Sequence, residues 1–278
     1  MNSIRMRFPG GLGKAFTMSY DDGVQQDKKL ISLMRAHGVK GTFNLNAGLF
    51  APEGTVYPAG QIHRRMTLSE CKETYAHEGI EVAIHGYTHP FLETLPTALC
   101  MSEITKDREG LEEAFGGIVR GAAYPYGTFN DDVITVLSLA GIAYCRTVRS
   151  THGFDIPSKW LTLDPTCHHN DPMLNEIADK FVSAAPDRNP MLFYLWGHAY
   201  EFEANDNWNV IEELLDKVSG KEDIWYATNI EIYDYVKAFR SLIFSADGCR
   251  VYNPTDKQIW FTAGKTACTV APGATIEF

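Results

Sequence analysis

Near the N-terminus the chain reads Phe16-Thr17-Met18-Ser19-Tyr20-Asp21-Asp22-Gly23, an apolar run that ends at two adjacent carboxylates. A short apolar run that stops at a turn signal is typical of a buried strand. A second polar group, His85-Gly86-Tyr87-Thr88-His89, stands further along the chain. Together the two segments offer one Asp and two His ligands to a divalent metal and leave a second Asp free for proton transfer. Metal-assisted hydrolysis requires this set of groups.

Short apolar runs alternate with helical patterns over most of the chain. We predict strands over residues 15–20, 41–45, 81–84, 121–124, 143–148, 160–163, 191–196 and 225–228. We predict helices over residues 25–37, 68–77, 98–115, 131–140, 173–184, 208–218 and 230–239. Strands that alternate with helices at this spacing form a parallel sheet with the helices outside it. Roughly seven or eight such units favour an α/β fold whose sheet is a closed or nearly closed barrel.

The sequence changes character after Arg240. Residues 241–278 contain short strand patterns and turns, such as Pro272-Gly273, and no helical pattern. We therefore predict a barrel over residues 1–240 and a small β-rich C-terminal appendage over residues 241–278. The appendage is too short to hold a core of its own and should not fold independently. Its sheet edge could be covered by a second subunit, so an oligomer stays open.

Composition and net charge limit the kinds of molecule that this protein could bind. The chain has 278 residues, of which 45% are hydrophobic and 22% charged, and these values are ordinary for a soluble globular protein. Its formal charge of -10 gives no basic surface for a phosphate backbone, so we expect no nucleic-acid partner. No apolar run approaches the roughly 20 residues of a membrane span, and the start lacks a signal-peptide pattern. We expect a cytoplasmic protein, although a trimmed leader would reverse that inference. The six dispersed cysteines are expected to be reduced.

Polar clusters stand at the ends of four predicted strands. They are Asp21-Asp22, His85, the turn Tyr124-Pro125-Tyr126-Gly127, and His198. Each has an ordinary structural explanation, since Asp-Asp-Gly is a frequent turn and a histidine at a strand end is usually a hydrogen-bonded loop residue. α/β barrels place their active sites at the carboxyl ends of their strands. The joint occurrence of four such clusters therefore indicates a single site at the mouth of the barrel.

The same motifs resemble the polysaccharide deacetylase family, the NodB-homology carbohydrate esterases. The family's Thr-Phe-Asp-Asp-Gly motif is similar to Ser19-Tyr20-Asp21-Asp22-Gly23, and its His-(Ser/Thr)-x-x-His motif to His85-Gly86-Tyr87-Thr88-His89. Its Arg-x-Pro-Tyr-Gly turn is similar to Ala123-Tyr124-Pro125-Tyr126-Gly127, and its late Leu-x-Leu-His segment to Tyr194-Leu195-Trp196-Gly197-His198. The resemblance covers roughly residues 14 to 235. It implies a distorted (β/α) barrel of the NodB-homology type.

The resemblance also implies an activity and roles for named residues. Asp22, His85 and His89 would hold a divalent metal ion, most readily Zn²⁺. Asp21 would be the base that deprotonates metal-activated water, and His198 the acid that protonates the leaving amine. The oxyanion would be stabilised by the metal and the backbone N–H of Tyr126. The implied enzyme is a metal-dependent hydrolase of linear amide C–N bonds that removes an N-acetyl or O-acetyl group. Its substrate would be an acetylated amino sugar or glycan.

Some positions depart from the family pattern. The arginine that orients the catalytic aspartate is replaced by Ala123, and Arg146 or Arg149 could supply its charge. Gly86 stands where the family has a Ser or Thr that braces the metal loop, so the loop must be held in another way. Trp160 is predicted either to line the acyl pocket or to pack in the core.

Other residues of the predicted mouth have open roles. His169 is predicted to contact substrate, to pair with Asp21 or to have a loop role. Glu201 and Glu203 are candidates to orient His198. Two other functions also stay open: a catalytically impaired carbohydrate-binding barrel, and a hydrolase of another linear amide or ester. The presence of both carboxylates and all three histidines favours the enzyme, because a binding remnant has no chemical need for all five.

Overall fold

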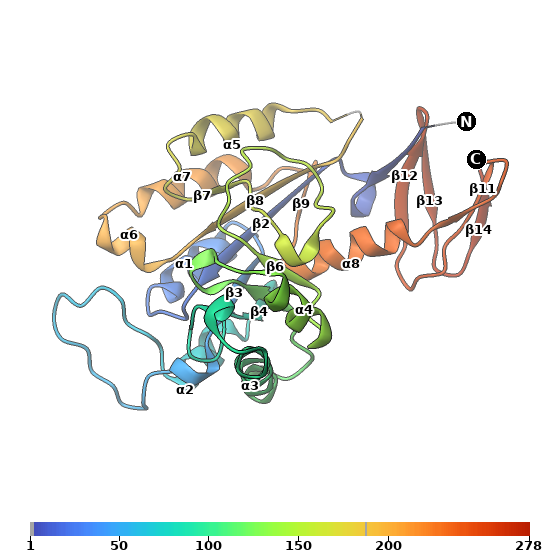
Figure 1. The fold of residues 1–278 in the computed structure, drawn as a ribbon. Helices are drawn as coiled ribbons and strands as arrows, with labels where there is room; N and C mark the ends of the chain where they lie inside the picture. Colours follow the sequence, from blue (N-terminus) through green and yellow to red (C-terminus); the bar gives the residue numbers. More distant parts are fainter. Residues whose placement is uncertain (1–2, 187) are drawn as a thin grey trace.

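The fold is built around one parallel sheet, as the alternation of elements predicted. The structure is a computed structural model that describes residues 3–186 and 188–278. The sheet has eight strands in the order β6-β5-β4-β3-β2-β8-β7, with β9 pairing with β2 beside β3, and every pair is parallel. Its strands are β2 (Lys14–Asp21), β3 (Gly41–Leu45), β4 (Ile80–Ile84), β5 (Gly121–Ala123), β6 (Tyr144–Arg146), β7 (Cys167–His168), β8 (Met191–Gly197) and β9 (Ile224–Tyr226). The predicted parallel sheet is confirmed, and Figure 1 shows it curled with helices around it.

The gap between the two edge strands is bridged by the segment that follows β6. Leu163 forms an isolated parallel bridge with Arg146, and the N–H of Thr166 donates to the carbonyl of Tyr194 in β8 at 2.8 Å. The strand predicted over residues 160–163 is wrong, because Trp160–Thr162 form the 3-10 helix η5. This turn lets the Trp160 side chain pack edge-on against Tyr233 at 5.0 Å, where it is buried. Of residues 160–163, Leu163 keeps a strand-like pairing through hydrogen bonds with Cys145 and Thr147, so the barrel is closed there by one bridge and not by a full ladder.

Helices cover the outside of the curled sheet (Figure 1). They are α1 (Asp27–Ala36), α2 (Leu68–Tyr75), α3 (Thr97–Phe115), α4 (Asp131–Leu139), α5 (Leu174–Ser183), α6 (Tyr200–Ala204), α7 (Asn209–Val218) and α8 (Asn229–Arg240), with α6 the one that the sequence patterns did not predict. Short 3-10 helices also occur at η1 (Pro9–Gly11), η2 (Ala47–Leu49), η3 (Leu92–Thr94) and η4 (Pro125–Gly127). Within residues 3–186 and 188–278, each helix is too short or too polar to cross a lipid bilayer.

Local signals explain where several helices begin. Thr67 and Glu70 form a capping box at the start of α2, and Thr228 and Glu231 form another at the start of α8. The Asn130 side chain accepts the N–H of Val133 and caps α4. Each cap satisfies backbone donors that the first turn of a helix leaves unpaired. The apolar faces of α5 and α7 pack on each other and share one core with Phe193 and Leu195 of β8, where Phe181 of α5 lies edge-on to Phe193 at 5.4 Å.

Antiparallel strands from both ends of the chain form two small sheets. In one, β12 (Ile259–Ala263) lies between β1 (Ile4–Arg7) and β13 (Thr266–Val270). In the other, β11 (Arg250–Tyr252) lies between β10 (Ile243–Phe244) and β14 (Thr275–Glu277). Both sheets lie beyond the end of α8, as Figure 1 shows. The extra C-terminal strands are confirmed, while the division of the chain at residues 240 and 241 stays a prediction. The N-terminal strand β1, which the sequence patterns missed, shares a sheet with β12.

Candidate active site

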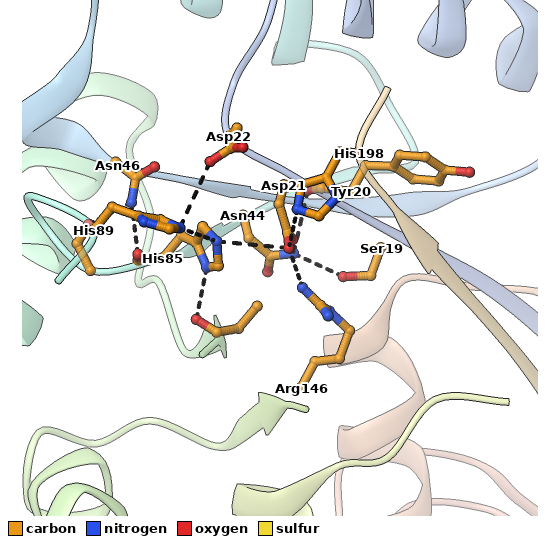
Figure 2. Close-up of polar contacts among 12 residues, drawn as sticks. Ser19, Tyr20, Asp21, Asp22, Asn44, Asn46, His85, His89, Arg146 and His198 are labelled. Atoms are coloured by element: carbon orange, nitrogen blue, oxygen red, sulfur yellow. Dashed lines mark hydrogen bonds and ion pairs between the residues drawn. The ribbon is translucent and has the colours of Figure 1, made fainter. Parts of the chain in front are cut away.

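The two adjacent carboxylates lie where β2 ends, at one mouth of the barrel. Asp21 is the last residue of β2, and Asp22 follows in the left-handed region with φ of 82°. Such a conformation is uncommon for a non-glycine residue and often marks a functional site. It turns the chain so that both side chains face the same space, and Figure 2 shows them directed toward His85, His89 and His198.

Asp21 is held on both of its carboxylate oxygens. Asn44 in β3 donates from Nδ2 to Oδ1 at 2.7 Å, and Arg146 in β6 donates from Nη2 to Oδ2 (Figure 2). Burial alone would raise the pKa of Asp21, but Arg146, His85 and His198 together outweigh it and lower that pKa. Asp21 is therefore a buried, ionised carboxylate that is held in one orientation.

The structure distinguishes between the two arginines that could replace the missing one. The Arg146 guanidinium is completely buried, contacts Asp21 and lies 4.4 Å from the centroid of the Trp196 ring. Arg149 instead pairs with Asp164, with 3.0 Å between Nη2 and Oδ1, and its side chain is 61% exposed. Of the two candidates, Arg146 is the one in contact with Asp21.

Asp22, His85 and His89 form a compact cluster of possible metal ligands. One ligand atom from each lies within 4.8 Å of the others. His85 donates from Nδ1 to the carbonyl of Ala123 at 2.9 Å, so its Nε2 is left unprotonated in the neutral ring and faces Nε2 of His89 at 3.2 Å. Two imidazoles on one tetrahedral Zn²⁺ at about 2.1 Å would be about 3.4 Å apart, which is close to this separation. Burial lowers the pKa of both rings, that of His89 to about 4, so both are neutral ligands at neutral pH. The residues therefore fit a divalent ion.

The loop that carries these histidines is braced by two residues outside the motif. Asn46 donates from Nδ2 to the carbonyls of His85 and Gly86 at 2.7 and 2.6 Å. Asp107 in α3 accepts the N–H of His85 at 2.9 Å and that of Ala47 at 2.6 Å. Burial raises the pKa of Asp107 to about 7. These contacts take the place of the Ser or Thr that Gly86 replaces.

Two basic residues that sequence reasoning missed also contact Asp22. They lie on the long loop between η2 and α2, which projects from the barrel in Figure 1. His63 donates from Nε2 to Oδ2 of Asp22 at 3.2 Å, and Arg65 donates from Nη2 to Oδ1 at 3.1 Å. Burial raises the pKa of Asp22, but the His63 hydrogen bond and the nearby cationic groups outweigh this effect and hold it well below its usual range. No sequence motif marks His63 or Arg65. They reach the site only because the fold places their loop beside it.

His198 lies just beyond the end of β8 and is oriented by Glu201. Its Nδ1 donates to Oε1 of Glu201 at 2.9 Å, so its Nε2 is directed to Asp21, 3.7 Å from Oδ2. Burial lowers the pKa of His198, but Glu201, Asp21 and Asp22 outweigh it and raise the net value. Glu203, the other candidate, instead forms a bidentate pair with Arg64. Glu201 is therefore the carboxylate that positions His198.

A cavity of about 560 Å³ unites most of the predicted site residues. Its lining consists of Asp21, Asp22, His85, His89, Tyr124, Tyr126, Gly127, Val148, Trp196, His198 and Tyr200. Tyr126 sits in η4 in the left-handed region, with φ of 58°. Trp196 lines this cavity with an apolar ring, whereas Trp160 is not among the lining residues.

Trp160 and His169 are not brought to this cavity. Trp160 is buried against α8 on another part of the molecule, so of its two predicted roles the wall of the acyl pocket is wrong and packing in the core is the one observed. His169 is 1% exposed and stacks on Phe202 at 4.1 Å. Its Nε2 lies 3.0 Å from Oε2 of Glu201, so its contact is with the carboxylate that orients His198 and not with Asp21.

Two sequence comparisons show which proteins this chain is similar to. The model of the polysaccharide deacetylase family matches residues 11–145. A chitin deacetylase from a Pestalotiopsis species is 27% identical over 130 residues, a match that spans 46% of this chain and 39% of that protein.

Two solved structures share the fold. One is a Mycobacterium smegmatis protein assigned to the polysaccharide deacetylases, with a TM-score of 0.58 and 15% identity over 86% of this chain and 96% of that one. The other is the Xyl-CE4 domain of a multidomain xylanase from the hindgut metagenome of Trinervitermes trinervoides, with a TM-score of 0.54 and 16% identity over 81% and 92%. The chain is therefore similar to polysaccharide deacetylases over residues 11–145, and its fold is the barrel of the NodB-homology type.

Proposed function

We propose that this protein is a metal-dependent hydrolase that removes the acetyl group from an acetylated amino sugar of a glycan and releases acetate. The proposal rests on the burial and ionisation of the Asp21 carboxylate. A buried carboxylate is held ionised by Arg146 in the same cavity as three candidate metal ligands and His198. This arrangement provides a base, a Lewis-acid site and an acid within one cavity.

The metal would be held by Asp22, His85 and His89. Their carboxylate and neutral imidazole donors suit several first-row divalent ions, and Zn²⁺ is the ion that we propose first. When bound, such an ion lowers the pKa of water and polarises a carbonyl group. His63 and Arg65 contact the carboxylate of Asp22 and would fix its orientation as a ligand.

Asp21 takes the proton from the attacking water. Its low pKa keeps it ionised at neutral pH, and its contacts with Asn44 and Arg146 fix the direction of its free lone pairs. The water oxygen forms a bond with the acetyl carbon while Asp21 receives the proton. The backbone N–H of Tyr126, on the rim of the cavity, would stabilise the negative oxygen that results.

His198 supplies the proton that the leaving nitrogen needs. Glu201 fixes the Nδ1–H tautomer and raises the pKa of His198, so Nε2 carries a proton toward the cavity near neutral pH. As the carbon–nitrogen bond breaks, this proton passes to the amine. The proton on Asp21 can then return to His198 across the 3.7 Å between their atoms, and this transfer restores the starting state.

The catalytically impaired barrel is the less favoured function. The reason to consider it is that Ala123 stands where the resembled family has the arginine that orients the catalytic aspartate. The contact of Arg146 with Asp21 removes this reason, because it supplies the same charge from the next strand. Hydrolysis of another linear amide or ester uses the same groups, and a substrate panel separates it from deacetylation.

The experiment measures metal content and acetate release together. The purified wild-type chain, loaded with zinc, should bind about one ion and release acetate from chitooligosaccharides. Asp22→Ala should lose the ion, while Asp21→Asn should keep it and lose acetate release. Asp256→Ala, which changes an exposed aspartate in the C-terminal β unit, is the matched control. A wild-type chain that binds no zinc, or an Asp21→Asn variant with unchanged turnover, would refute the proposal.

A further inference from the structure

Four nitrogen-bearing side chains surround the carboxylate of Glu201. Its Oε1 accepts the hydrogen bond from Nδ1 of His198. Its Oε2 accepts from Nδ2 of Asn170 at 2.8 Å and lies 3.0 Å from Nε2 of His169. Nε2 of His168 lies 3.3 Å from the same oxygen. The proposed mechanism uses the bond at Oε1 and gives no role to the three residues at Oε2.

His169 is a histidine in a buried and mostly apolar position. Its ring packs against Phe202 at 4.1 Å and against Tyr20 at 5.7 Å. Its Nδ1 has no hydrogen-bond partner within residues 3–186 and 188–278 and lies against Gly197, where an added Cβ would be 2.0 Å away. Burying an imidazole in this way costs free energy that an apolar side chain would not cost. The contact between Nε2 and Glu201 is therefore what a histidine adds at this position.

The groups at Oε2 are uncharged at neutral pH, so the cluster carries the single negative charge of Glu201. Burial lowers the pKa of His168 to about 4, and it lowers the pKa of His169 more than Glu201 raises it. Nδ1 of His168 accepts the N–H of Asn170 at 3.1 Å, so the neutral ring carries its proton on Nε2, toward Glu201. Burial raises the pKa of Glu201, but the contacts with His169 and His198 outweigh it and hold that pKa well below its usual range. His198 therefore faces an ionised carboxylate.

Glu201 lies close enough to the surface to rotate into water. Its side chain is 21% exposed and extends from the five-residue helix α6. A glutamate that is held at both oxygens loses rotamer freedom, and the groups that hold it must offset this cost. The donors at Oε2 therefore keep Oε1 directed at His198.

We propose that His169 is a positioning residue for the acid of the reaction: with Asn170 it holds the Oε2 end of Glu201 and so keeps Oε1 bonded to His198. The inference rests on the proposed function, in which His198 protonates the leaving nitrogen. His169 does not line the cavity, so it does not contact the substrate. It acts through Glu201 on the proton affinity of His198 and on the direction of its Nε2.

The direction of the pH effect distinguishes positioning from simple withdrawal of charge. Burial lowers the pKa of His198, and the hydrogen bond to Glu201 is the largest of the effects that raise it. If His169 and Asn170 hold Glu201 in place, their loss frees the carboxylate and lowers the pKa of His198. If they only withdrew negative charge from the carboxylate, their loss would raise that pKa. The other ionisable groups around His198 keep their positions in both cases; they are Asp21 and Asp22 at the end of β2, Arg146 beside Asp21, His168 in β7, Tyr200 in α6, and His63 beside Tyr200.

Two measurements follow His198. NMR titration of its imidazole in EDTA gives its pKa, with its resonance among those of nine histidines assigned from His198→Gln. With zinc, the alkaline limb of kcat/KM for acetate release from chitooligosaccharides reports the same group. His169→Leu removes one donor, His169→Gln keeps an amide N–H near the position of Nε2, and Asn170→Ala removes the other donor at an exposed position. Ile211→Val, in the buried face of α7, is the control for destabilisation alone.

The expected effect is a shift to lower pH. His169→Leu and Asn170→Ala should each lower the pKa of His198 by about 0.5–1, which corresponds to the loss of one hydrogen bond. Above this pKa, kcat should fall by about threefold to tenfold, while KM stays unchanged because neither residue contacts the substrate. His169→Gln should restore most of the pKa and of kcat, and Ile211→Val should leave both unchanged.

The outcomes separate this inference from the proposed function. If the wild type releases acetate and His198 titrates at the same or a higher pH in His169→Leu, the positioning role is wrong and the proposed function stands. The same result in Asn170→Ala decides the question if His169→Leu does not fold. A shift that Ile211→Val reproduces would also overturn the positioning role. If the pKa of His198 falls as expected but the wild type releases no acetate, the proposed function fails and the link from His169 to His198 stands.

Discussion

Arg146→Met removes the cation beside Asp21 and keeps a long apolar chain next to Trp196. The wild-type pair is almost completely buried, with Asp21 2% exposed and Arg146 fully covered. After the substitution, Asn44 is the remaining side-chain hydrogen-bond donor to the Asp21 carboxylate within the described residues. The carboxylate must then either stay charged in a poorly solvated position or take up a proton.

The size of the effect follows from the burial of the pair. Removing one partner of a buried ion pair costs about 3–5 kcal/mol of unfolding free energy. In a protein of this size each kcal/mol shifts Tm by about 2–4 °C, so we expect a fall of roughly 6–20 °C. Asp21→Asn/Arg146→Met removes the uncompensated charge as well. The double variant should therefore recover most of the stability that Arg146→Met loses.

The assay is thermal or urea-induced unfolding of the four chains of this mutant cycle in EDTA. Arg149→Met is the control, because that arginine is exposed and should change the stability by less than about 0.5 kcal/mol. Activity gives a second readout. Without Arg146, burial is expected to raise the pKa of Asp21, so the acid limb of the kcat/KM profile should move to higher pH. Equal stability of Arg146→Met and Arg149→Met, or strictly additive effects in the cycle, would refute the reasoning.

Three other predictions concern the charged residues of the site and a buried aspartate outside the cavity. Ala123→Arg/Arg146→Ala, which moves the guanidinium one strand over, should retain more acetate release than Arg146→Ala alone; equal rates would show that the charge acts only from β6. Glu201→Gln should keep the zinc content but lower the pKa of His198, so kcat/KM should fall at alkaline pH by roughly tenfold or more. An unmoved alkaline limb would remove Glu201 from its positioning role. Asp27 is buried, and burial raises its pKa to about 8 against about 3.9 in an unfolded chain. Its contribution to stability is therefore fully present below about pH 4 and is lost as the pH rises through about 8. Relative to Asp27→Asn, the wild type should lose up to about 1.4 kcal/mol per pH unit in this window, and parallel urea-unfolding curves of stability against pH would contradict it.

Contiguous features of the site could be predicted from the sequence. The end of β2, the turn at Asp21-Asp22-Gly23 and the pair His85 and His89 depend on neighbouring residues, so local patterns identify them. The left-handed conformation of Asp22 could not be predicted from those patterns. The strand order and the closure of the barrel through Leu163 depend on contacts between distant segments. Strand β1 was missed because it is short and is formed by pairing with β12, far away in the chain.

The sequence of β8 contains a pattern that could have shown which tryptophan lines the cavity. In β8, side chains alternate between the two faces, so Tyr194 and Trp196 share a face that ends beside His198. This alternation favours Trp196 over Trp160 as the apolar wall. The bracing of the metal loop had no such signal, because Asn46 and Asp107 come from separate elements and meet His85 only in the fold.

The register of the sheet explains why Arg146 contacts Asp21 although Ala123 stands where the Arg-x-Pro-Tyr-Gly turn of the resembled family has its arginine. Ala123 in β5 and Arg146 in β6 are Cα partners across the two parallel strands. Partners in a parallel pair direct their side chains to the same face, so position 146 reaches the space that position 123 faces. The small side chain of Ala123 leaves room for the guanidinium of Arg146, which lies between Asp21 and Trp196. The charge beside Asp21 is thus determined by position in the sheet and not by position in the motif. A comparison of motifs alone would therefore conclude that this arginine is missing, although the neighbouring strand supplies one.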